Sequence, residues 1–74
     1  MDRRLVVHHL TQAARHVKDG ELILARQRRF IEKLREVGED STAAELLLIR
    51  FKESQAMHIE THARLRAELK ELTP

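Results

Sequence analysis

The clearest hydrophobic pattern in the chain runs from Thr42 to Leu72. Apolar residues recur there at alternating steps of four and three, with no Gly or Pro in the stretch. Because these steps place residues on one side of a helix, the pattern predicts a long α-helix whose seam packs on a partner helix. The seam consists of Ala44, Leu48, Phe51, Gln55, His58, His62, Leu65, Leu69 and Leu72. Its middle three positions are polar, so we expect a polar layer between the helices.

A similar pattern occupies the first half of the chain and predicts a helix over residues 3–37. Asp2 is suited to cap its start. Apolar residues repeat there every seven positions on three adjacent lines, which form one broad helical face. The lines are Leu10, Val17, Leu24 and Ile31; Val6, Ala13, Gly20, Gln27 and Leu34; and Ile23, Phe30 and Val37.

The Asp19-Gly20 dipeptide is the one place where this N-terminal helix could break. Asp-Gly is typical of turns, and Gly inside a helix costs about 1 kcal/mol relative to Ala. Asp19 could then cap a separate helix, which would give three helices in all. However, the seven-residue repeat crosses Gly20 without a change of phase. We therefore expect one continuous helix, in which Gly20 leaves room for a facing residue.

Residues 38–41 have the composition of a turn between the two helices. Gly38 suits the left-handed conformation that ends many helices. Thr42 and Glu45 fit a capping box with Thr42 as the N-cap, although Asp40 or Ser41 could cap instead.

A connection this short makes two helices antiparallel neighbours. The expected fold is thus an all-α antiparallel two-helix hairpin, with helices over about 3–37 and 42–72, in a single domain spanning residues 1–74.

Both helices carry more apolar surface than one antiparallel contact covers. The extra apolar residues of the C-terminal helix are Leu46, Leu47, Ile49, Met57 and Ile59. Domains this small often gain stability by oligomerisation. We therefore expect two hairpins to form a homodimeric four-helix bundle with coiled-coil packing.

Three short motifs accompany this pattern. They are His-Val-x-x-Gly-Glu over 16–21, Ala-Arg-Gln-Arg over 25–28, and Gly-x-Asp-Ser-Thr over 38–42 before a run of leucines. Through these motifs the chain resembles, over most of its length, a group of small uncharacterised bacterial helical-hairpin proteins. The resemblance implies a helical hairpin and no particular activity.

Composition narrows the possible functions. The 74 residues include no Cys, which excludes disulfides and thiolate zinc sites. Residues 1–37 hold nine Lys and Arg against five Asp and Glu, whereas residues 38–74 hold five against seven. Opposite charge on the two halves favours their packing on each other or on a second copy.

Localisation follows from what the chain lacks. No apolar run approaches the roughly 20 residues of a membrane-spanning helix, and the N-terminus lacks the features of a signal peptide. We expect a cytoplasmic protein that does not enter a membrane.

His58 and His62 are the leading candidates for chemistry. They are four residues apart on one helix, a spacing that lets two imidazoles meet one ion. In a hairpin that turns at 38–41, His62 should face Val17 with His16 beside it, and His58 should face Glu21. The metal-site prediction is therefore that His58, His62 and His16 bind zinc or a similar divalent ion.

The interpretation we favour is that the same histidines form a polar layer that fixes the pairing of the helices. Gln27 and Gln55 extend this layer, and we expect their amides to lie within about a turn of each other. The stretch from His58 to His62 matches no known helical metal-binding motif, because its Glu occupies the middle position. No cofactor is expected.

A basic face on the N-terminal helix is the candidate nucleic-acid surface. Its residues are Arg15, Arg26, Arg29 and Lys33. Lys and Arg can contact phosphates, but the small net charge of +2 and the lack of aromatic residues for base stacking argue against such a partner. We expect a solvated face with intrahelical ion pairs.

The sequence as a whole predicts a protein that is not an enzyme. It lacks Cys, a Gly-rich loop and a nucleophile elbow. The expected function is a non-catalytic interaction or regulatory module that acts as a homodimer and has room for another protein partner. The alternatives are a metal- or pH-responsive protein using His16, His58 and His62, and a weak nucleic-acid binder.

Overall fold

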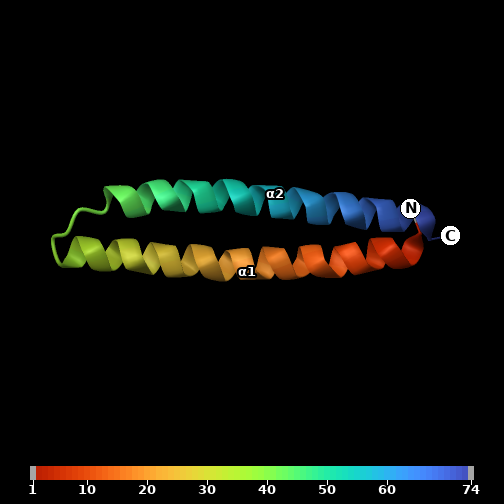
Figure 1. Cartoon of the computed structure of the whole chain (residues 1–74), viewed down its shortest axis with the longest axis horizontal. Coiled ribbons are helices and arrows are strands. Elements are labelled where there is room, and N and C mark those ends of the chain that lie inside the picture. Colours follow the sequence, from red (N-terminus) through yellow and green to blue (C-terminus); the bar gives the residue numbers. More distant parts are fainter. Residues whose placement is uncertain (1, 74) are drawn as a thin grey trace.

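The computed structural model describes residues 2–73 as two long antiparallel helices joined by a short turn (Figure 1). Helix α1 spans Arg3–Glu36 and helix α2 spans Thr42–Leu72. The hairpin is a rod with extents of 58 × 14 × 14 Å. The all-α hairpin predicted from the sequence is thus confirmed, while Met1 and Pro74 of the expected 1–74 domain lie outside the described residues.

Helix α1 continues through Gly20 without a break, as the unbroken repeat predicted. Asp2 caps its start, since its carboxylate accepts a hydrogen bond from the backbone N–H of Arg4 at 3.1 Å. The helix ends at Glu36, one residue earlier than expected, because Val37 has left the helical conformation, with φ −93° and ψ 5°.

The helices meet along the predicted seam. Every seam position of α2 is buried or partly buried except Leu72, which is 39% exposed at the end of the helix. Helix α1 contributes the two lines through Leu10 and Val6. The most deeply buried residues are Val6, Ala13, Ile31, Ala44, Gln55 and Leu65. The third line of α1, through Phe30, stays exposed because α2 packs along the other two lines and nothing else between residues 2 and 73 covers it.

Gly20 leaves the space that the side chain of Gln55 occupies. A Cβ atom on residue 20 would lie 1.8 Å from Oε1 and 2.6 Å from Cδ of Gln55. Gln55 is only 6% exposed, and its amide Nε2 donates to the backbone carbonyl of Val17 at 2.8 Å. Gly20 is therefore a packing residue inside a continuous helix.

The register of the two helices differs from the expected one by about a helical turn. His58 was expected opposite Glu21, but its ring lies beside that of His16, with 5.1 Å between ring centroids. The contact between Gly20 and Gln55 fits the same shifted register. The slip keeps the same heptad lines in contact, since sliding a helix by one turn returns the same face to its partner.

Gly38 ends α1 in the left-handed conformation that the sequence predicted, with φ 74°. The N–H of Gly38 donates to the carbonyl of Arg35 at 3.1 Å, and that of Glu39 donates to the carbonyl of Leu34 at 2.8 Å. These two bonds form a Schellman motif, which satisfies carbonyls that the helix end would otherwise leave without partners.

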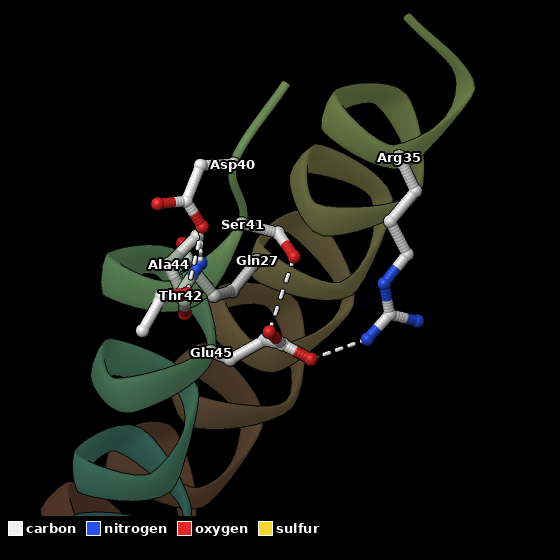
Figure 2. Close-up of polar contacts among 7 residues, drawn as sticks. All are labelled: Gln27, Arg35, Asp40, Ser41, Thr42, Ala44 and Glu45. Atoms are coloured by element: carbon white, nitrogen blue, oxygen red, sulfur yellow. Dashed lines mark hydrogen bonds and ion pairs between the residues drawn. The ribbon is translucent and has the colours of Figure 1, made fainter. Parts of the chain in front are cut away.

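The start of α2 differs from the expected capping box. Thr42 is already the first helical residue, and Ser41 holds the cap position without a side-chain bond to the backbone. The Asp40 carboxylate instead accepts from the backbone N–H of Thr42 at 3.0 Å and from its hydroxyl at 2.7 Å (Figure 2). Glu45 reaches back to the hydroxyl of Ser41 at 3.1 Å and pairs with Arg35 of α1.

The contact between Gly20 and Gln55 predicts a coupled pair of substitutions. In a Gln55→Ala background, Gly20→Ala should raise the free energy of unfolding by about 1 kcal/mol, because Ala favours helix and fills vacated space. In the wild-type background the new methyl group displaces the Gln55 amide from Val17, a loss of about 0.5–1.5 kcal/mol that offsets this gain. Urea unfolding of the four proteins measures the coupling. Equal stabilisation by Gly20→Ala in both backgrounds would contradict the contact.

The Asp40 cap predicts a pH-dependent contribution to stability. The hydrogen bonds from the side chain and then the backbone of Thr42 hold the pKa of Asp40 below its usual 3.8. A carboxylate with a lowered pKa stabilises the fold above its unfolded pKa, and this stability is lost as pH falls through the folded value. Asp40→Asn should therefore lower the melting temperature at about pH 6 and make less difference near pH 3. Glu39→Gln, which removes a carboxylate from the same turn, is the control; an identical pH profile for both variants would refute the cap.

Candidate functional site

One side of the hairpin carries a cluster of exposed apolar side chains. Ile23 and Phe30 follow one heptad line of α1, and Val37 comes one heptad after Phe30, just beyond the end of the helix. They are 42%, 52% and 68% exposed, respectively. Leu47 of α2, 42% exposed, lies on the same side, because it is one heptad before Ser54, which lines a hollow together with Ile23. We call Ile23, Phe30, Val37 and Leu47 the apolar face. The sequence predicted its α1 line, but Leu47 could be placed on it only once the hairpin geometry was known.

The apolar face is confined to the half of the rod nearest the turn. Further from the turn, the same side is lined by polar groups of both helices. These are His9, Gln12, His16, Thr61 and Arg64. Other large apolar residues are exposed around α2 near the turn, including Leu46 at 59% and Ile49 at 51%.

His16 and His58 lie together at the boundary between the apolar and polar halves. The angle between their ring planes is 52°, and Ser54 Oγ lies 3.5 Å from His58 Nε2. His16 is exposed and His58 partly buried. Asp19 and Gln55 line the same hollow. The position of Ser54 could be predicted from the sequence, because it precedes His58 by one helical turn. Asp19 could not be placed in this hollow from the sequence, because the residues of α1 that face His58 depend on the register of the helices.

The structure does not gather all three predicted metal ligands. His62, partly buried in the seam, lies one turn beyond His58, on the side away from the hairpin turn. Between residues 2 and 73, no group of three or more His, Cys, Asp or Glu side chains is arranged to hold one metal ion. A single hairpin thus presents a pair of imidazoles from two helices rather than a three-histidine cluster.

The two glutamines of the expected polar layer each bind the backbone of the opposite helix. Gln27 Nε2 donates to the carbonyl of Ala44 at 2.9 Å (Figure 2), as Gln55 does to that of Val17. The predicted amide pair between Gln27 and Gln55 is therefore wrong, because the shift in register moves them apart along the rod. Gln55 Oε1 is buried and has no hydrogen-bond partner within residues 2–73.

The candidate nucleic-acid residues Arg15, Arg26, Arg29 and Lys33 are all exposed on α1. The expected intrahelical pairs are not formed by these four. Over the described chain, ion pairs join Arg4 to Asp2 and Arg35 to Glu45. Leu22, 51% exposed, interrupts the basic face, and no aromatic side chain belongs to it.

The fold of the chain defines its class, which is that of all-α helical hairpins. Neither helix described within residues 2–73 is apolar over a length that could cross a membrane. The chain matches no protein-family model, and no curated protein or solved structure matches it significantly. The likeness to bacterial helical-hairpin proteins therefore stays an expectation.

Proposed function

We propose that this chain is a non-catalytic helical interaction module that acts as a homodimer, with the apolar face as the contact between two copies. The observation that carries the proposal is the exposure of Phe30, 52% open to solvent in the middle of the apolar face. Contiguous apolar patches on small soluble proteins mark interaction sites, because leaving them in water is unfavourable.

A second copy is the partner whose chemistry fits this face. A two-fold axis parallel to the rod would place the apolar face of each copy on that of the other, with the turns at the same end. Helix α1 of one copy would then face helix α2 of its partner. Because the first half of the chain carries an excess of positive charge and the second half an excess of negative charge, this pairing also brings opposite charges together.

The resulting assembly would be a four-helix bundle, a common way for helical hairpins to complete a core. Each hairpin has one buried stripe, and the bundle would add a second core layer from Ile23, Phe30 and Leu47. Regulation in this proposal comes from the dimer surface, which presents α2 residues such as Leu46 and Ile49 to a further protein partner.

Nucleic-acid binding is the weaker second candidate. It is favoured by the exposure of Arg15, Arg26, Arg29 and Lys33 and by their lack of ion pairs within residues 2–73. A binding constant that falls steeply with salt concentration would support it. Salt-independent or undetectable binding to both DNA and RNA would exclude it.

The dimer proposal predicts opposite outcomes for two matched substitutions in α1. Phe30→Lys places a charge in the proposed interface, and we expect it to weaken dimerisation by at least about 100-fold. Leu22→Lys changes a residue of almost equal exposure, 51%, on the outer side of the same helix, and should leave dimerisation unchanged. Sedimentation equilibrium measures both dissociation constants. A dimer that survives Phe30→Lys as well as Leu22→Lys would show that the apolar face is not the contact.

A further inference from the structure

We propose that His16 and His58 of two copies together form one zinc site with four imidazole ligands. The inference rests on the proposed homodimer, and it adds to that dimer a ligand that neither copy can hold alone. It starts from a place in the hairpin where two potential metal ligands from different helices meet.

The spacing of the two rings fits shared coordination. Imidazoles bind zinc at about 2.0–2.1 Å through nitrogen, so two rings on one tetrahedral ion have centroids about 5 Å apart. The centroids of His16 and His58 are separated by 5.1 Å, and their planes are tilted by 52° rather than stacked. The separation of the two rings therefore matches that of two imidazoles bound to one ion.

One hairpin cannot complete such a site. Structural zinc is held by four protein ligands, and His16 and His58 supply two. No third His, Asp or Glu joins them in a metal-binding group within the described residues. The remaining two ligands must therefore come from outside the hairpin.

The partner's position in the dimer supplies those ligands. His16 precedes Ile23 by one heptad, so it lies on the same line of α1 as the apolar face. Because His16 is exposed on that side, a side-by-side partner with its turn at the same end brings its own His16 and His58 to the same level. The two pairs then meet near the two-fold axis.

The surroundings of the pair resemble the outer shell of a metal site. Metal-bound histidines are usually oriented by an oxygen acceptor at their second ring nitrogen. Ser54 Oγ, 3.5 Å from His58 Nε2, is such a group, and Asp19 lines the same hollow. Gln55 lines this hollow too, and its buried Oε1 atom lacks a partner within residues 2–73.

Calorimetric titration of the full chain with zinc chloride tests the site. We expect one zinc ion for every two chains. His16→Ala and His58→Ala should each weaken binding by more than about 100-fold, because each removes two ligands from the dimer. His62→Ala is the matched control, since it removes a seam histidine of α2 that lies outside the pair, and it should leave zinc binding unchanged. Circular dichroism checks that each variant stays helical.

Light scattering of the same samples in EDTA and in zinc separates this inference from the dimer proposal. A dimer in EDTA that binds no zinc, binds one ion per chain, or binds equally well after His16→Ala would overturn the zinc site and leave the proposed function intact. A monomer under both conditions would overturn both. A tetrahedral cobalt spectrum in the wild-type dimer that disappears in His16→Ala would support the site directly.

Discussion

A pair of helices can bury only one stripe of each, and this constraint governs the rest of the structure. The stripe here is a narrow seam in which six of the described residues are deeply buried, one of them the polar Gln55. The fold therefore closes without covering Ile23, Phe30 and Leu47, which a larger domain would place in its core. The same two-helix geometry leaves apolar surface exposed to solvent, because small domains bury a small fraction of their apolar area. This exposed apolar surface favours association.

Within the seam, the alignment of the helices depends on one small residue facing one large polar residue. Gly20 admits the Gln55 side chain, and the Gln55 amide then binds the backbone carbonyl of Val17. A buried amide costs free energy unless it is satisfied, so it penalises alignments that separate it from its acceptor. Apolar seams alone lack this selectivity. The proximity of His16 and His58 follows from the same alignment.

The sequence predicted the elements of this fold well and their alignment poorly. The seven-residue repeat predicted the seam, the continuity of α1 and an apolar line through Phe30, and Gly38 marked the turn. That this line is the one left exposed followed only from the structure. The register was wrong because helices that slide by one turn keep the same heptad lines in contact, so the pattern cannot distinguish the alternatives. The error carried into the candidate site, where His58 meets His16 rather than Glu21. The sequence favoured Thr42 as the cap and left Asp40 and Ser41 as alternatives, because several neighbouring side chains could serve and only backbone geometry selects among them.

Small-angle X-ray scattering with molar-mass determination on the wild-type protein tests the central claim, that two hairpins lie side by side through the apolar face. A side-by-side dimer has twice the 8.7 kDa mass of the chain but keeps a longest dimension near the 58 Å of a single hairpin, with a thicker cross-section. That is the result we predict. A particle of 8.7 kDa at every concentration, or a dimer close to twice as long as one hairpin, would contradict the claim.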